Sequence, residues 1–178
     1  TEKLLKLLPR NRVLTYGLDK CCDIFATDLK QDKTYTYYTI NRGDEKTPAK
    51  LKGIGKHNVL NSLAAFAAAK VVELSTQRII DAFKSFPGLE RRLEVYNKTN
   101  DLVLVNDYAH NPGKIRACID SVKQAWPQHE LIVVYEPHRY SRLTTLYHEL
   151  LSSFKQSNHV YVLPVFSAGE KVIQKFFL

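Results

Sequence analysis

The chain of 178 residues, 44% of them hydrophobic, is long enough for one domain or two small ones with a buried core. Its 26 Lys and Arg exceed its 18 Asp and Glu and give a net charge of +8, but they are scattered, which argues against a nucleic-acid-binding module. No apolar run approaches about 18 residues and no signal pattern opens the chain, so we expect a soluble protein without a membrane span. The three cysteines lack metal-ligand spacing and predict reduced thiols in a reducing compartment.

The first third of the chain is predicted to be mainly β-structure, because β-branched and aromatic residues alternate with polar ones there. The elements expected in chain order are a helical turn or two over residues 1–8, a buried strand over 13–17, a β-hairpin within 23–40 that turns at 31–32, a polar turn over 41–48 and a short strand over 49–53. Together they predict an antiparallel section.

Two helices are expected next, over residues 59–74 and 76–86. Ser75 is the predicted N-cap of the second helix. Three polar side chains cluster at the start of the first one: His57, Asn58 and Asn61. Capping the helix would use only one of them, and the two amides lie on one helix face, where they suit a purine edge or a ribose.

The second half of the chain alternates strands and helices in the doubly wound manner. Strands are expected over residues 102–108, 130–136 and 159–165, with helices over 112–125 and 142–156 between them. Such alternation predicts a parallel sheet with right-handed crossovers. Polar loops follow the first two strands, and we expect both loops at the carboxyl ends of neighbouring strands, where open α/β sheets bind ligands.

Five motifs in one order resemble the Mur ligase family of bacterial peptidoglycan synthesis. They are GKHNVLNSLAA at 55–65, FPGLERRLE at 86–94, NDYAHNP at 106–112, EPHRYSR at 136–142 and VFSAGE at 165–170. The Pro-His-Arg-Tyr-Ser-Arg string resembles the family member that adds alanine. The resemblance implies a cytoplasmic, ATP-dependent ligase that joins L-alanine to UDP-N-acetylmuramate through an acyl phosphate.

The resemblance also implies an α/β fold in two parts. Residues 1–94 correspond to the end of the family's central ATPase domain, an antiparallel hairpin plus helices, and residues 95–178 to the first part of a Rossmann-like domain with a partial parallel sheet. No Gly-x-x-x-x-Gly-Lys-Ser/Thr string occurs in the sequence. We therefore expect a fragment that is inactive alone, with the family's Mg²⁺ ligands upstream and no metal ligand in this chain.

Site roles follow from the resemblance, motif by motif. The residues implied in ATP binding are His57, Asn58, Asn61 and Asp107, the last of them at the ribose. Arg91 or Arg92 is expected to reach the transferred phosphate, where a guanidinium neutralises developing charge. The residues implied in receiving the amino acid are Tyr108, His110, His138, Arg139 and Arg142. A guanidinium fork suits a carboxylate, and His110 near neutral pH can take the proton of the ammonium group.

Two residues depart from the family pattern. Asn106 stands where the family has Asp, and Asn111 where it has His. We assign neither a catalytic role. Three alternatives remain open: a murein-recycling ligase that attaches a peptide to the same sugar nucleotide, a basic nucleic-acid-binding module, and a non-catalytic remnant.

Overall fold

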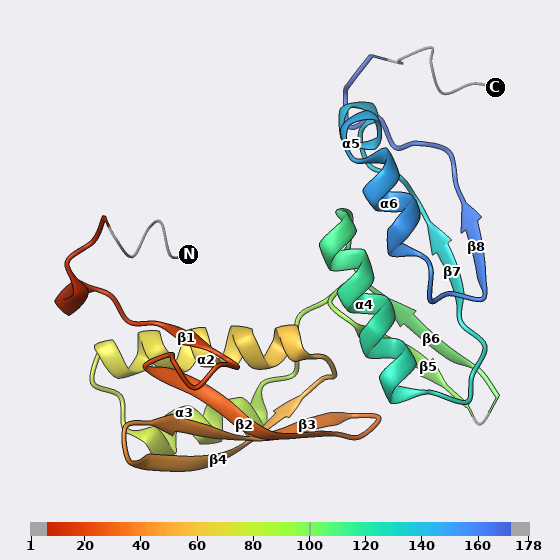
Figure 1. Cartoon of the computed structure of the whole chain (residues 1–178). Coiled ribbons are helices and arrows are strands. Elements are labelled where there is room, and N and C mark those ends of the chain that lie inside the picture. Colours follow the sequence, from red (N-terminus) through yellow and green to blue (C-terminus); the bar gives the residue numbers. More distant parts are fainter. Residues whose placement is uncertain (1–6, 100, 172–178) are drawn as a thin grey trace. The chain divides into compact units, whose positions relative to one another are not determined.

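The computed structural model describes residues 7–99 and 101–171. The chain divides into two compact units, Thr1–Leu89 and Glu90–Leu178, which we call unit 1 and unit 2 (Figure 1). Of the helical turns expected over residues 1–8, residues 1–6 lie outside the described part. No helix in the described residues is both long and apolar enough to cross a membrane.

In its described residues, 7–89, unit 1 is built on a four-stranded sheet in the order β1-β2-β3-β4. Its strands are β1 (Tyr16–Gly17), β2 (Ile24–Gln31), β3 (Tyr35–Arg42) and β4 (Glu45–Lys52). β1 runs parallel to β2, and the other pairs are antiparallel. The predicted β2–β3 hairpin is confirmed, because Asp32 Oδ1 accepts the backbone N–H groups of Thr34 and Tyr35 at 2.6 Å each.

Two predictions in unit 1 were right only in part. The strand expected over residues 13–17 is only β1, and Tyr16 is 45% exposed because β1 ends the strand order. The polar turn expected over 41–48 is a turn at Gly43, followed at once by β4. Pro48 suggested a turn, but it lies in β4 at the other end of the strand order, where its missing N–H costs no ladder hydrogen bond.

The core of unit 1 lies between the sheet and the helices α2 (Lys56–Val71) and α3 (Thr76–Ser85). Its most buried side chains are Ile24, Ile40, Val59, Leu63 and Phe66. α3 is confirmed, with the Ser75 hydroxyl accepting the Arg78 N–H at 3.4 Å. α2 begins three residues before its predicted start and ends at Val71, because Glu73 turns left-handed with φ 62°.

The register of β2, β3 and β4 gathers side chains that are scattered in the sequence. Tyr37 pairs with Lys30 on one side and Lys50 on the other, and Tyr35 pairs with Lys52. Lys50 Nζ lies 3.8 Å from the centre of the Tyr35 ring, a cation–π contact. The sheet face opposite α2 and α3 is therefore basic and aromatic, although spacing along the chain does not reveal it.

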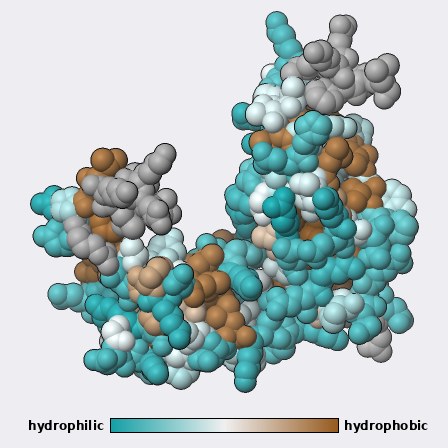
Figure 2. Space-filling view, in the orientation of Figure 1, coloured by the Kyte–Doolittle hydropathy of each residue, from teal (hydrophilic) through white to brown (hydrophobic). Residues whose placement is uncertain are grey.

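Unit 2 follows the predicted alternation with shorter elements. Its described elements are β5 (Glu94–Lys98), β6 (Val103–Asn106), α4 (Pro112–Ala125), β7 (Ile132–Tyr135), α5 (Tyr140–Thr145), α6 (Tyr147–Ser153) and β8 (His159–Val162). α4 matches its prediction, and it packs with α6 and β7 around Ile115, Ile119, Tyr135 and Leu150. Figure 2 shows hydrophobic surface near the carboxyl end of β8, where Val162 is 65% exposed.

Two predictions for unit 2 needed correction. β7 pairs parallel with β8, but β6 pairs antiparallel with β5, and the described residues show no ladder between β6 and β7. The described residues of unit 2 thus form one antiparallel and one parallel pair of strands in place of a single parallel sheet. The helix expected over 142–156 is two short helices meeting at Leu146, because the hydroxyls of Thr144 and Thr145 bond carbonyls four residues back, a contact that bends helices.

Candidate functional site

The first polar group lies at the start of α2 in unit 1. His57, Asn58 and Asn61 belong to the first two turns of α2, whose N-cap is Gly55 with φ 96°. Among the described residues no side chain caps this helix. Asn58 Nδ2 donates instead to the Ile54 carbonyl at 2.8 Å, which fixes the glycine turn that leads into the helix. Asn61 is exposed.

Sequence reasoning missed Gln31, which reaches this turn from the end of β2. Its Oε1 accepts the Gly55 N–H at 2.7 Å, while its Nε2 is buried without a partner in the described part of the chain. An unpaired buried donor is costly unless a ligand or water satisfies it. The helix start therefore has one buried N–H donor available to a hydrogen-bond acceptor. Only the strand register could have revealed Gln31, since 24 residues separate it from Gly55.

In unit 2, the loop after β6 is tied to the turn that carries the paired arginines. Asp107 Oδ2 accepts the Leu93 N–H at 2.8 Å, and the Tyr108 N–H donates to the Arg91 carbonyl at 2.8 Å. Arg91 and Leu93 both have positive φ, 54° and 47°. A positive φ at a non-glycine residue persists only where the surrounding contacts stabilise it. Asp107 thus fixes the turn from which the exposed Arg91 and Arg92 side chains extend.

Three aromatic rings of the predicted amino-acid wall come together. The ring centres of Tyr108 and His110 are 5.3 Å apart in an edge-to-face pair, and those of His110 and His138 are 6.4 Å apart. His110 Nδ1 lies 3.0 Å from the Tyr108 carbonyl oxygen. Since a carbonyl only accepts, Nδ1 carries the proton and Nε2 is the nitrogen that can take one.

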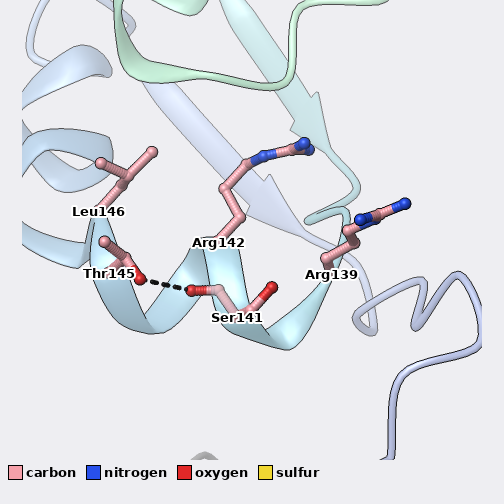
Figure 3. Close-up of a pocket in the computed structure, with 5 residues that line it drawn as sticks. All are labelled: Arg139, Ser141, Arg142, Thr145 and Leu146. Atoms are coloured by element: carbon pink, nitrogen blue, oxygen red, sulfur yellow. Dashed lines mark hydrogen bonds between the residues drawn. The ribbon is translucent and has the colours of Figure 1, made fainter.

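Residues 136–142 after β7, which we call the arginine loop, bring two guanidiniums to the same place. Arg142 Nη1 lies 3.3 Å from the His138 carbonyl oxygen and 3.4 Å from His138 Nδ1. Figure 3 shows Arg139 and Arg142 extending to the same side of α5. With Ser141, Thr145 and Leu146 they line an open hollow of about 300 Å³. This arrangement provides two fixed positive charges beside an imidazole, which suits a carboxylate ligand.

The two departures from the family pattern have local explanations. Asn111 is the N-cap of α4, and its Oδ1 accepts the Lys114 N–H at 2.9 Å. A histidine at this position would lack the favoured capping oxygen. Asn106 is the last residue of β6 and pairs with Glu94 of β5. Asn111 therefore stabilises the helix that follows the Tyr108–His110 loop.

The structure therefore groups the predicted residues into two sets. The residues of unit 2 lie in connected loops: Arg91, Arg92, Asp107, Tyr108, His110, His138, Arg139 and Arg142. His57, Asn58 and Asn61 belong to unit 1. Over residues 7–99 and 101–171, no group of three or more His, Cys, Asp or Glu side chains could hold a metal ion. The described residues do not by themselves fit a Mg²⁺ site.

Comparison with known proteins shows similarity over nearly the whole chain. Residues 91–175 match the family description "Mur ligase, glutamate ligase domain". The chain is 36% identical over 177 residues to the UDP-N-acetylmuramate–L-alanine ligase of Endomicrobium trichonymphae, covering 98% of this chain and 39% of that protein. The chain belongs to the Mur ligase family. Members of this family are ATP-dependent amide ligases that use ATP and Mg²⁺.

Other relatives agree with the family assignment. A second UDP-N-acetylmuramate–L-alanine ligase, from Desulforapulum autotrophicum, is 34% identical over 175 residues, covering 97% of this chain and 38% of that protein. The chain thus spans less than two fifths of either curated relative. The crystal structure of a UDP-N-acetylmuramate–alanine ligase from Thermotoga maritima gives a TM-score of 0.74 at 22% identity, covering 86% of this chain and 34% of that one.

A murein peptide ligase from Psychrobacter arcticus also shares the fold. Its TM-score is 0.52 at 21% identity, and the match covers 84% of this chain and 38% of that one. At this identity the likeness concerns the fold alone.

Proposed function

We propose that a full-length protein carrying this chain joins L-alanine to UDP-N-acetylmuramate. ATP phosphorylates the muramate carboxylate and leaves as ADP, the alanine amine attacks the acyl phosphate, and phosphate leaves as the amide forms. The observation that carries the proposal is the pair of guanidiniums, Arg139 and Arg142, beside His138 and His110. Two relatives at 36% and 34% identity bear the name of this activity.

The amino-acid end of the proposed site is in unit 2. Arg139 and Arg142 bind the alanine carboxylate, because planar guanidiniums match a carboxylate with paired hydrogen bonds. His110 accepts the ammonium proton on Nε2, since Nδ1 is bonded to the Tyr108 carbonyl. Tyr108 and His138 form the wall against which the small side chain rests.

The residues that we assign to the nucleotide come from the family motifs of each unit, taken separately. His57, Asn58 and Asn61 contact adenosine, Asp107 accepts the ribose hydroxyls, and Arg91 or Arg92 meets the transferred phosphate. ATP supplies the phosphoryl group, and guanidiniums stabilise the negative charge that shifts during transfer.

The domain assignment is part of the same proposal. Residues 1–94 are the end of the central ATPase domain and residues 95–178 the first part of the C-terminal domain, in a cytoplasmic enzyme. The boundary between the two compact units lies after Leu89, which is close to the proposed domain boundary after residue 94.

The direct test is phosphate release by the full-length protein with ATP, Mg²⁺, UDP-N-acetylmuramate and L-alanine. We expect phosphate release that requires all four components. The product should have the summed mass of UDP-N-acetylmuramate and L-alanine less one water. Replacing L-alanine with the tripeptide L-alanyl-D-glutamyl-diaminopimelate distinguishes the peptide-ligase alternative. Turnover with the peptide and none with alanine would reject the proposed substrate.

The nucleic-acid alternative has one observation in its favour, the basic and aromatic sheet face of unit 1. Tyr37 lies between Lys30 and Lys50 on that face, and single strands bind such surfaces by stacking and charge. However, Tyr37 Oη also donates to Asp32 at 3.2 Å, which places a carboxylate there. Fluorescence anisotropy with a labelled oligonucleotide at 150 mM salt tests this alternative, and tight binding lost in Tyr37→Ala would support it.

A further inference from the structure

The segment after β8 turns back onto the arginine loop. Phe166 bridges the loop with two backbone hydrogen bonds of 2.8 Å, donating to the Pro137 carbonyl and accepting from the Arg139 N–H. Ala168 and Gly169 then take positive φ, 50° and 85°, which reverses the chain within a few residues. We call residues 166–170 the return turn. It ends by bringing Glu170 to the start of α5.

Both carboxylate oxygens of Glu170 are engaged by one residue of the arginine loop. Oε2 accepts the Ser141 N–H at 3.0 Å, and Oε1 accepts the Ser141 hydroxyl at 2.6 Å. These bonds, with the nearby charge of Arg139, hold the pKa of Glu170 below its usual range. Because both oxygens are used, this carboxylate is suited to hold the loop rather than to bind an incoming ammonium group.

Arg139 needs such support because its backbone is unfavourable. Its φ is 71°, a left-handed value that costs a non-glycine residue energy. The return turn holds it from both sides, through the Phe166 carbonyl before α5 and through Ser141 within it. The backbone conformation of Arg139 sets the direction in which its guanidinium leaves the chain. The return turn therefore fixes the backbone position from which the Arg139 side chain extends beside Arg142.

We propose that Glu170 is a positioning residue for recognition of the amino-acid carboxylate. It acts through Ser141 and Arg139, and its hydrogen bonds, rather than its charge, hold the two guanidiniums in place. The inference rests on the proposed function and extends it to a third loop, since the binding site for the amine substrate is complete only when the return turn is closed on α5.

Two substitutions separate hydrogen bonding from charge in the full-length enzyme. Glu170→Gln removes the charge but can still accept the Ser141 N–H and donate to the Ser141 hydroxyl, whereas Glu170→Ala removes both contacts. With L-alanine varied at saturating ATP and sugar nucleotide, we expect Glu170→Ala to raise the alanine KM about tenfold or more and Glu170→Gln to raise it less than about threefold. The ATP KM should stay within about twofold in both.

Ser141→Ala and the double variant with Glu170→Ala complete the test. If Glu170 acts through Ser141, the double variant should bind alanine no worse than Glu170→Ala alone. Glu149→Ala, an exposed carboxylate of α6, is the matched control and should leave the alanine KM unchanged. An unchanged alanine KM in Glu170→Ala would overturn the inference. An equal rise of the alanine KM in Glu170→Ala and Glu170→Gln would also overturn it, because the role would then belong to the charge of Glu170. A wild-type enzyme without alanine-dependent turnover would instead reject the proposed function.

A measurement on the 178-residue chain tests the positioning without any activity. Ser141 is the second residue of α5, so its N–H has no carbonyl partner within the helix, and Glu170 provides its protection from solvent exchange. We expect amide hydrogen exchange at Ser141 to be about tenfold or more faster in Glu170→Ala and close to wild type in Glu170→Gln. Equal exchange in all three chains would refute the hydrogen-bonded return turn.

Discussion

Asp107 Oδ2 accepts the backbone N–H of Leu93 at 2.8 Å, joining the loop after β6 to the turn that carries Arg91 and Arg92. Leu93 is only 5% exposed, so its N–H has little access to water if Asp107 is lost. One carboxylate therefore has a structural task in addition to its proposed contact with a ribose.

Asp107→Ala should destabilise unit 2, because it leaves the Leu93 N–H unpaired, at a cost of about 1–3 kcal/mol. Asp107→Asn keeps an accepting oxygen and should lose less. Urea unfolding followed by Trp126 fluorescence measures the change, since Trp126 is the only tryptophan in the sequence and is 3% exposed within unit 2. Asp120→Ala, an exposed carboxylate on α4, is the control, and equal midpoints for Asp107→Ala and Asp120→Ala would contradict the prediction.

Asn61 tests the nucleotide end of the site in the full-length enzyme. Its side chain is exposed on α2, so Asn61→Ala should not destabilise the fold. Loss of one adenosine hydrogen bond, worth about 0.5–1.5 kcal/mol, should raise the ATP KM by about 2- to 12-fold while leaving the alanine KM nearly unchanged. Gln124→Ala on the exposed face of α4 is the matched control. A selective loss of alanine affinity would show that the nucleotide assignment is wrong.

Local signals predicted much of the secondary structure. Ser75 marked the start of α3, Pro112 the start of α4, and Asp32 the β2–β3 turn, because caps and turns depend on nearby residues. The errors came where tertiary context decided the outcome. Pro48 fits a strand only because β4 ends the strand order, and the break at Leu146 depends on hydroxyls that bond within the helix.

In the candidate site, too, local motifs could be predicted from the sequence and long-range contacts could not. The residues of the two polar loops were identified from their sequence motifs, and the contacts from His110 to His138 and from His138 to Arg142 join them. Gln31 and Glu170 were not predicted as site residues, because each reaches its partner across more than 20 residues of chain, Gln31 to Gly55 and Glu170 to Ser141. Neither partner could be known without the strand register or the return turn.

Cys118 should be the least reactive of the three cysteines. Burial, with a smaller contribution from the charge of Asp107, raises the pKa of its thiol from 9.0 to about 12. At pH 8 iodoacetamide should modify the exposed Cys21 well before Cys118, as peptide mass mapping can show. All three should react in urea. Modification of Cys118 as fast as Cys21 in the native chain would contradict this burial.

The raised pKa of the Cys118 thiol also predicts how the free energy of unfolding depends on pH. A thiol whose pKa is raised on folding favours the native state while it is protonated. Its contribution is therefore fully present below about pH 9 and is lost as pH rises toward 12. Cys118→Ser should show a smaller loss of unfolding free energy between pH 8 and pH 11 than the wild-type chain, measured through Trp126 fluorescence. An identical pH profile for the two chains would remove Cys118 as the cause.

The arginine loop gives the most direct test of the proposed amine substrate. Arg142 Nη1 contacts both the carbonyl and the ring of His138, and the guanidinium reaches the same side of α5 as that of Arg139 (Figure 3). Lysine keeps the charge but has no planar fork and cannot make paired bonds to a carboxylate. In the full-length enzyme, Arg142→Lys and Arg139→Lys should each raise the alanine KM about tenfold or more, with the ATP KM nearly unchanged.

Arg116→Lys is the matched control for this pair. Arg116 lies on α4, where its Nη2 donates to the Ser152 hydroxyl at 3.4 Å, and it is not one of the proposed site residues, so its replacement should leave the alanine KM as it is. The readout is steady-state kinetics with L-alanine varied at saturating ATP and sugar nucleotide. If both arginine-loop variants keep the wild-type alanine KM and turnover, the guanidiniums do not bind the carboxylate. The main structural reason to prefer a free amino acid over a peptide as the incoming amine would then be lost, because a peptide presents its own carboxylate farther from the reacting nitrogen.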